Sequence, residues 1–315
     1  MKIAIIGPGI SSIPPVGWGA VEILIWDYKQ VLESLGHEVH IVNINSAEQI
    51  ISQTNNINPD FIHVQYDEHY HIVERFNCKN VILTTHYAYL EQPTKIGSYL
   101  SLFNGFIKSN AYVFALSSGI KDVYVKNGMD ENKIHVIPNG VRDDLFNYKE
   151  QEVEDKSIYL AKIDYRKRQF LFEGVNNLYF AGNIADQRFK STNYLGEWNK
   201  EYLYENLTNF ANLVLLSDGE AHPLVCLEAM VAGLGLVLSQ YATANLDLSK
   251  PFIDVIPEDK INDIKYIENV VVENRKKSLA MRSEIRKYVL DNFKWQHIIK
   301  DMYIPTVEKI FKDKL

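Results

Sequence analysis

The sequence predicts an α/β protein of two domains, each built on a parallel sheet with crossover connections. Three observations support this prediction. Short apolar runs alternate with helical or irregular segments along the chain, which is the pattern of parallel strands joined by crossovers. The alternation stops at a turn-rich stretch near residue 140 and begins again after it. The length of 315 residues also suggests two domains of roughly 150 residues each.

The composition fits a globular protein and argues against several functions. Hydrophobic residues make up 46% of the chain and charged residues 23%, which is enough to form a core. The net charge is −7 and both halves carry more acidic than basic residues, so neither nucleic-acid binding nor contact with a membrane surface is indicated. No apolar run approaches the ~20 residues of a membrane span, and the N-terminus lacks the features of a signal peptide.

The two cysteines, Cys78 and Cys226, do not form a Cys-x-x-Cys pair, which predicts neither a disulfide framework nor a structural zinc site. A reducing, cytoplasmic location fits best. The sequence also contains no group of residues typical of a metal site, since the acidic doublet at 143–144 is interpreted as a turn cap. We therefore expect neither a metal nor a cofactor.

The first predicted strand, residues 2–6, ends at a Gly-Pro-Gly sequence at 7–9. It begins like the G-x-G-x-x-G fingerprint of dinucleotide-binding proteins. The third glycine position is Ser12, however, and two prolines at 14–15 stand where the helix should begin. The sequence therefore argues against an NAD cofactor.

The loop instead continues through Gly17 and Gly19 before a predicted helix at 21–35. Glycines at these positions would allow backbone amides to come close to a ligand, although a long surface turn is the alternative. Further β-rich runs complete the first domain, at 38–42, 61–65, 81–84, 112–116 and 133–137.

Two histidines in this domain have different interpretations. His86 follows the run 81–84, so it lies at the carboxyl end of a strand, where ligands bind in open α/β sheets. The alternative is that it caps a backbone group. His63 lies inside the run 61–65 and is interpreted as a core histidine.

A turn signal at 138–141 precedes a linker at about 143–156, after which the strand–helix alternation begins again. The second domain is expected to contain strands at 157–161, 178–181, 212–216, 236–238 and 253–256, followed by helices at 275–293 and 295–311.

A cluster of cations directly follows the strand at 157–161. Its four members lie within seven residues and are Lys162, Arg166, Lys167 and Arg168. At the end of a strand, such a cluster is well placed to neutralise a diphosphate. A solvated surface is the alternative, but the position in the same domain as the next motif favours phosphate binding.

The stretch 218–239 carries the strongest chemical signal. Glu220 and Glu228 have seven residues between them, and Pro223 occupies the expected first position of a helix at 224–231. A free helix N-terminus attracts phosphate. A loop with one Glu beside that N-terminus and another a turn inside the helix therefore suits a ligand with both phosphate and hydroxyl groups. A nucleotide sugar is the first candidate.

With these motifs, the chain resembles the family 4 glycosyltransferases, which are retaining, nucleotide-sugar-dependent enzymes of the GT-B fold. Four features carry the resemblance: the loop PPVGWGAVE, the crossing HVIPNGV, the Lys/Arg cluster and the Glu-x7-Glu motif EAHPLVCLE. They occur in the order of the family and span residues 7–240. The Glu-x7-Glu motif, with the EAMVAG that continues it, is the most specific.

The resemblance implies two Rossmann-like domains that face a cleft. Residues 1–145 would form the acceptor-side domain and residues 146–293 the domain that binds the nucleotide sugar. A C-terminal helix at 294–315 would cross back and pack on the first domain. Because 315 residues are few for this fold, acceptor-side loops are expected to be short.

The resemblance also implies roles for individual residues. Glu220 would contact the hydroxyls of the donor sugar, and His86 would lie near the reacting sugar. Lys162 and Lys167 would stabilise the departing diphosphate. The family's usual Gly-Arg is Ala161-Lys162 here, which weakens one bidentate phosphate contact.

Other positions would bind the donor without taking part in the chemistry. Glu228 would hold the ribose hydroxyls, and backbone amides at the start of the following helix would hold the distal phosphate. The residues implied in binding are Gly17, Gly19, Arg166, Leu224, Val225 and Glu228.

The function implied is transfer of a hexosyl group from a nucleoside-diphosphate sugar, UDP- or GDP-linked, to a hydroxyl acceptor. The acceptor would be a glycan, a lipid-linked sugar or a small molecule, and the reaction would retain the anomeric configuration without a metal. An inverting transferase, a sugar-nucleotide 2-epimerase and a non-catalytic sugar-nucleotide-binding protein are the alternatives. Side chains around 194–198 and loops of the first domain would decide the donor and the acceptor.

Overall fold

The structure is a computed structural model that describes residues 1–17 and 19–312. Trp18 of the glycine loop and residues 313–315 of the expected C-terminal helix lie outside the described residues. The chain forms two compact units. Unit 1 comprises Met1–Asn139 together with the segment that begins at Trp295, and unit 2 comprises Gly140–Lys294. Each unit contains a parallel sheet, so the predicted α/β class is confirmed.

Unit 1 is built on a six-stranded parallel sheet. Its strands are β1 (Lys2–Ile6), β2 (Glu38–Val42), β3 (Phe61–Val64), β4 (Val81–Thr84), β5 (Tyr112–Ala115) and β6 (Ile134–Val136). Their order is β2-β1-β3-β4-β5-β6, so the direction in which strands are added reverses between β1 and β3. In open α/β sheets, ligands bind outside the carboxyl ends of the strands at such a reversal.

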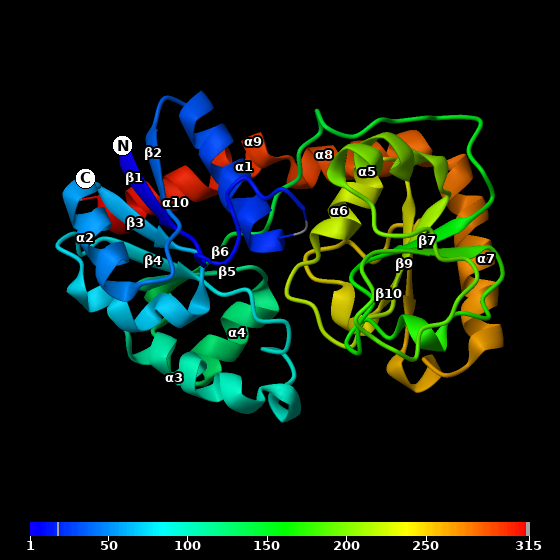
Figure 1. The fold of residues 1–315 in the computed structure, drawn as a ribbon, viewed down its shortest axis with the longest axis horizontal. Coiled ribbons are helices and arrows are strands. Elements are labelled where there is room, and N and C mark those ends of the chain that lie inside the picture. The colour runs from blue at the N-terminus through cyan, green and yellow to red at the C-terminus, as the bar shows by residue number, and fades with distance from the viewer. Residues whose placement is uncertain (18, 313–315) are drawn as a thin grey trace. The chain divides into compact units, whose positions relative to one another are not determined.

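Helices cover both faces of this sheet (Figure 1). They are α1 (Ala20–Ser34), α2 (Ala47–Ile57), α3 (Leu100–Lys108), α4 (Ser118–Lys126), α9 (Trp295–His297) and α10 (Ile304–Phe311). Figure 1 shows α3 and α4 on one side of the sheet, and α1, α9 and α10 on the other. α1 buries Leu24, Tyr28 and Val31, which recur at helical spacing and form the face that packs on the core.

The C-terminal segment packs into unit 1. A π-helical stretch, Ile298–Tyr303, connects α9 to α10. Trp295 is fully buried, and its Nε1–H donates to Asp27 of α1 at 3.0 Å. The Tyr303 ring lies 5.2 Å from the ring of Tyr28, centroid to centroid. These buried aromatic contacts hold the segment against α1.

Unit 2 is built on a five-stranded parallel sheet. Its strands are β7 (Ser157–Leu160), β8 (Leu178–Ala181), β9 (Asn212–Leu215), β10 (Gly235–Ser239) and β11 (Ile253–Ile256). Their order is β11-β10-β9-β7-β8, so here the reversal falls between β7 and β9.

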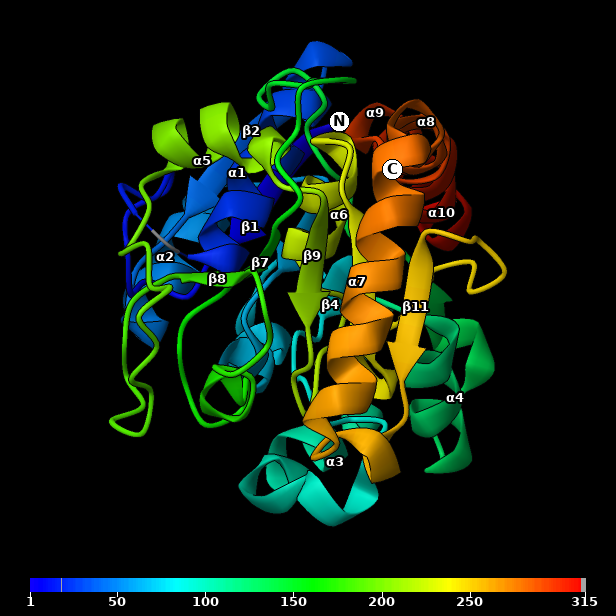
Figure 2. The ribbon, with the colours of Figure 1, turned by 90° about the vertical axis from the view of Figure 1, so that its right-hand side faces the viewer.

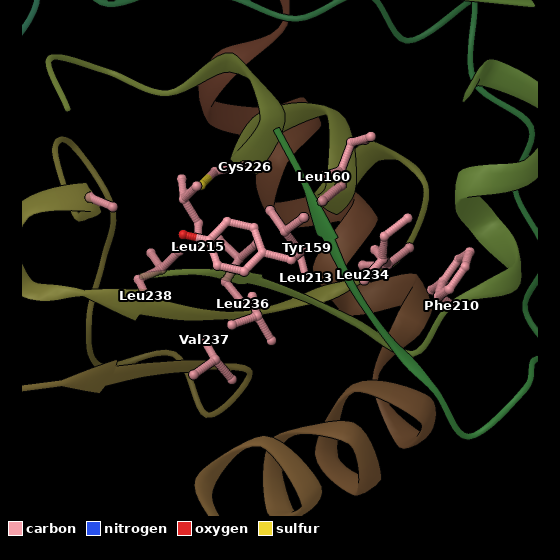
Figure 3. Close-up of a cluster of buried hydrophobic side chains, with 14 of the residues drawn as sticks. Tyr159, Leu160, Phe210, Leu213, Leu215, Cys226, Leu234, Leu236, Val237 and Leu238 are labelled. Atoms are coloured by element: carbon pink, nitrogen blue, oxygen red, sulfur yellow. The ribbon is translucent and has the colours of Figure 1, made fainter. Parts of the chain in front are cut away.

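The helices of unit 2 are α5 (Lys200–Asn206), α6 (Leu224–Val231), α7 (Ile264–Ala280) and α8 (Arg282–Phe293). Figure 2 shows α7 running along the sheet beside β9 and β11. In the core, Leu213 and Leu236 of neighbouring strands pack with Tyr159 and with Cys226 of α6 (Figure 3). Strands that are buried on both faces explain why these segments are continuous apolar runs in the sequence.

The prediction of a single helix at 275–293 is wrong. That segment spans the end of α7 and all of α8, with a break at Met281. The reason is tertiary, because α7 packs on the sheet whereas α8 packs on α6, and one straight helix cannot reach both. The helices α2, α3, α4 and α5 lie in segments where the sequence pattern indicates only helical or irregular structure.

The helices in 1–17 and 19–312 include none with the length and apolar character that a membrane crossing requires.

Candidate active site

In unit 2, the strand reversal brings together the loops that follow β7 and β9. The loop after β7 carries the cation cluster 162–168, and the loop after β9 carries Glu220. Because β7 and β9 are neighbours in the sheet, Lys167 and Glu220 are in contact although they are 53 positions apart in the sequence. The two strongest chemical signals of the sequence therefore form one site.

Glu220 is held by two cations. Lys167 Nζ donates to its Oε1, and Arg166 Nη1 lies 3.2 Å from its Oε2. Arg166 Nη1 also donates to the Gly219 carbonyl at 2.7 Å. The side chains of Lys167 and Glu220 are 10% and 9% exposed, whereas that of Arg166 is 32% exposed. The carboxylate is thus fixed between one buried and one partly exposed cation.

Two opposing effects act on the Glu220 carboxyl. Burial raises its pKa, but the positive charges of Lys167 and Arg166 together outweigh burial, so the pKa lies below its ordinary value. Glu220 is therefore a carboxylate at neutral pH. In that state it accepts hydrogen bonds from hydroxyl groups and cannot donate a proton.

The lowered pKa predicts how unit 2 responds to pH. Glu220→Gln keeps the shape of the side chain but leaves two cations without their counter-charge, so the variant should unfold at lower urea than wild type at neutral pH. A carboxyl whose pKa is lowered by folding contributes stability above its unfolded-state pKa and loses it as the pH falls through the folded-state value. The difference between the two proteins should therefore shrink below about pH 4.

Urea titrations read by hydrogen exchange of unit 2 peptides measure this difference. Glu273→Gln is the matched control, because Glu273 pairs with Lys276 at 2.6 Å on the surface of α7, and exposed pairs contribute little. A Glu220→Gln effect of the same size at acid and neutral pH would contradict the ionised state of Glu220.

The other two cations of the cluster differ from this pair. Arg168 donates to the carbonyls of Leu216 and Ser217 and forms an ion pair with Glu258. Its guanidinium therefore holds the end of β9. Lys162 has no ion pair among the described residues, which leaves its ammonium for a ligand.

Gly182, at the end of β8, lies very close to the backbone of Ala161 and Lys162 at the end of β7. Its φ is +140°, and a Cβ at this position would lie 2.0 Å from the carbonyl oxygen of Ala161. Only glycine permits this approach. A side chain at 182 would push apart the carboxyl ends of β7 and β8.

The sequence predicts an anion site at the start of α6. The helix begins at Leu224, and Pro223 is its N-cap, with ψ of 116°, rather than its first residue as predicted. Extended backbone at Pro223 is the reason. The amides of Leu224 and Val225 belong to the first turn, whose N–H groups have no acceptor within a helix. Glu228 lies one turn further along α6 and is partly exposed.

In unit 1, His86 lies two residues after the end of β4 and is partly exposed. Its Nε2 lies 2.9 Å from Oε1 of Gln65, and its backbone N–H donates to Asp67 at 3.3 Å. Desolvation lowers the pKa of His86 to about 4, so the imidazole is neutral at pH 7. His63 is fully buried between Tyr303 and Thr84, which confirms it as a core histidine.

The two glycines of the N-terminal loop have different surroundings. Gly19 is the N-cap of α1, and a Cβ there would lie 2.8 Å from Oε2 of Glu22. Glu22 is buried at the third helical position, where a carboxylate folds back on the N-cap. This negative charge disfavours a phosphate at the start of α1. A Cβ at Gly17 would meet no described atom within 4 Å.

Comparison with known families bears on this arrangement. Residues 40–145 match the model of Glycosyltransferase Family 4. This part of the chain is therefore similar to a family 4 glycosyltransferase domain. The match begins in β2, extends beyond β6 and includes His86. A search of curated protein sequences finds no match.

Several solved structures share the fold of this glycosyltransferase. HepE of Anabaena, determined in complex with UDP-glucose, has a TM-score of 0.72 at 14% identity, over 97% of this chain and 99% of HepE. Sucrose-phosphate synthase of Thermosynechococcus elongatus has a TM-score of 0.76 at 14% identity, over 99% of both chains. AviGT4, a glycosyltransferase of avilamycin A biosynthesis, has a TM-score of 0.72 at 16% identity, over 98% of both. The GT-B fold predicted from the sequence is confirmed, and the family match confirms the enzyme class.

Sequence analysis missed residues that support the site of this glycosyltransferase. The Tyr159 hydroxyl donates to the carbonyl of Lys167 and accepts from the N–H of Leu216 at 2.9 Å, so it joins the two loops of the unit 2 site. In unit 1, Gln65 contacts the ring of His86, and Asp67 accepts a hydrogen bond from its backbone N–H. Gln65 ends the predicted run 61–65, and its position at a strand end was the signal that could have identified it.

Within the described residues, no three His, Cys, Asp or Glu side chains of the glycosyltransferase are placed to hold a metal ion. The acidic doublet interpreted as a turn cap has cationic partners. Asp143 pairs with Lys294 at 2.7 Å, and Asp144 pairs with Arg142 at 2.6 Å. Metal independence stays a prediction. Both cysteines are free.

Proposed function

We propose that the chain transfers a hexosyl group from a UDP-sugar to a hydroxyl acceptor with retention of the anomeric configuration. One observation carries the proposal: Glu220 is held as a carboxylate by Lys167 and Arg166 directly before the first turn of α6. Cations and helix amides suit a diphosphate, and the carboxylate suits sugar hydroxyls. HepE was determined with UDP-glucose, which favours uridine over the other bases.

The proposed mechanism assigns separate roles to these groups. The bond between the anomeric carbon and the diphosphate breaks, and the diphosphate leaves with the bonding electron pair. Lys162, Lys167 and the amides of Leu224 and Val225 stabilise the charge that develops on it. Fixed donors aimed at developing charge are the largest catalytic contribution in many enzymes. Glu220 orients the sugar through its hydroxyls, and Glu228 holds the ribose.

The acceptor completes the reaction. Its hydroxyl oxygen bonds to the anomeric carbon, and its proton passes to the departing diphosphate or to water. We propose a glycan or lipid-linked sugar as acceptor, bound through unit 1, where His86 and the glycine loop lie. The reaction requires no metal or cofactor, and the free cysteines fit a reducing, cytoplasmic location.

A donor panel tests the proposal. The protein is incubated with UDP-, GDP-, ADP- and TDP-sugars, with and without EDTA, and release of the nucleotide is measured. We expect slow hydrolysis of a UDP-sugar in EDTA. Glu220→Ala should abolish this hydrolysis, because it removes the group that orients the sugar, whereas Glu273→Ala on the surface of α7 should behave as wild type.

The alternatives predict different outcomes. Strict dependence on a divalent metal would contradict the proposed mechanism, and an inverted product anomer in NMR would indicate an inverting transferase. Conversion of the sugar nucleotide without an acceptor would indicate a 2-epimerase. A tightly bound but unaltered sugar nucleotide would indicate a binding protein.

A further inference from the structure

A hydrogen-bonded chain runs from His86 into the core of unit 1. His86 Nε2 lies 2.9 Å from Gln65 Oε1, and Gln65 Nε2 lies 3.4 Å from Nδ1 of His63. His63 in turn contacts Tyr303, whose hydroxyl is 3.0 Å from the same Nδ1, and Thr84, whose Oγ1 is 2.7 Å from Nε2. His63 and Gln65 are almost completely buried, so neither bonds to bulk water in place of these partners.

With the amide oxygen of Gln65 facing His86 and its nitrogen facing His63, the chemistry of the groups indicates where the protons lie. An amide nitrogen only donates and an amide oxygen only accepts. Gln65 therefore donates to His63 Nδ1, which must carry a lone pair, and accepts from His86 Nε2, which must carry a hydrogen. His63 Nε2 then carries the other hydrogen and donates to Thr84. The single lone pair of His63 Nδ1 is then shared between the Tyr303 hydroxyl, at 3.0 Å, and the more distant amide of Gln65, at 3.4 Å.

Nδ1 of His86 has no hydrogen-bond partner among residues 1–17 and 19–312. In a neutral imidazole with a hydrogen on Nε2, Nδ1 is an acceptor. We propose that Gln65 is a positioning residue that holds His86 as the Nε2–H tautomer, so that Nδ1 accepts a hydrogen bond from a sugar hydroxyl of the substrate. This inference rests on the proposed function, in which His86 lies near the reacting sugar.

The titratable groups around His86 are consistent with a neutral ring. Asp67 accepts from the backbone N–H of His86 and, at 2.7 Å, from the Tyr99 hydroxyl. Burial raises the pKa of Asp67 to about 6. Burial also lowers the pKa of His63 to about 3, so no imidazolium forms at either histidine at neutral pH. The carboxylate of Asp67 contacts the backbone N–H of His86. The imidazole ring of His86 is held by the uncharged amide of Gln65.

Two substitutions of Gln65 distinguish the effect of the His86 tautomer from the effect of the His86 charge. Gln65→Glu places a carboxylate where the amide oxygen accepts, which should raise the pKa of His86 by more than about one unit and favour the imidazolium. Gln65→Leu removes the acceptor, so that the Nδ1–H tautomer becomes populated. Gln53→Glu is the control, because it adds the same charge at an exposed position of α2 in the same unit.

The ring nitrogens of His86 are followed by NMR of protein labelled with 15N in histidine, without substrate. At neutral pH, the wild type and Gln53→Glu should show protonated Nε2 and unprotonated Nδ1, and Gln65→Leu should show a mixture of tautomers. On acidification, the imidazolium of Gln65→Glu should form at a pH more than about one unit above that of the wild type. A wild-type Nδ1–H tautomer, or an unchanged tautomer in Gln65→Leu, would overturn the proposal.

Kinetics with the donor identified by the panel test the role in transfer. At a pH below the new pKa of His86, Gln65→Glu should lower kcat/KM at least about tenfold, the effect of one lost hydrogen bond. The loss should diminish as the pH rises through that pKa. A structural defect alone would not follow that pKa. Full activity with a charged His86 would overturn the role. If the wild type transfers no sugar at all, the proposed function fails, whereas the NMR result still decides the tautomer.

Discussion

Lys167→Ala is expected to lower kcat by ~10²–10³ with any donor that the wild type uses, which is the usual cost of removing one fixed group that stabilises developing charge. Lys167 is the buried cation of the site, and its ammonium contacts Glu220. Its loss removes positive charge next to the departing diphosphate and also frees one oxygen of Glu220. Steady-state release of UDP measures the effect, and circular dichroism checks that the variant is folded.

Lys276→Ala is the control for this substitution. Lys276 also forms a Lys–Glu pair in unit 2, but its side chain is 64% exposed on α7, so its removal should leave kcat unchanged. Lys167→Arg keeps the charge and should recover part of the activity. Wild-type activity in Lys167→Ala would show that the assignment of Lys167 to the diphosphate is wrong.

Arg282→Met is expected to produce the largest loss of stability in unit 2. The Arg282 side chain is almost completely buried, and its guanidinium donates to carbonyl oxygens of Lys149, Phe210, Thr208 and Ala232 and to the Thr208 hydroxyl. Burial lowers its pKa to about 10, so it stays charged at neutral pH. Removing it leaves several buried acceptors without a donor, at a cost of at least about 3 kcal/mol.

Hydrogen exchange of unit 2 peptides in urea measures the loss caused by Arg282→Met, and peptides of β1 to β5 in unit 1 provide an internal reference. Lys287→Ala is the control, because Lys287 lies on the same helix, α8, with a side chain that is 75% exposed. Unchanged protection of β9 and β10 in Arg282→Met would mean that water replaces the guanidinium without cost.

Much of the fold could be predicted from the sequence, and the reason is local. Most strands inside the two sheets, such as β3, β4, β9 and β10, are buried on both faces, so each is a short apolar run between turn signals. The helix at 224–231 was predicted with the bounds that α6 has in the structure. The prediction of one helix at 275–293 was wrong because the break between α7 and α8 falls at Met281, where no Gly or Pro indicates it in the sequence.

Residue types and spacing alone determined that this protein has a cation cluster after one strand and a Glu-x7-Glu motif after another. Only the tertiary structure decided which groups meet. The order β9-β7-β8 places Glu220 against Lys167 and Arg166, whereas Arg168, from the same cluster, holds the end of β9. Gln65 and His86 meet for the same reason, because β3 and β4 are neighbours. A sequence does not state which strands are adjacent, and the partner of a charged or polar side chain depends on that adjacency.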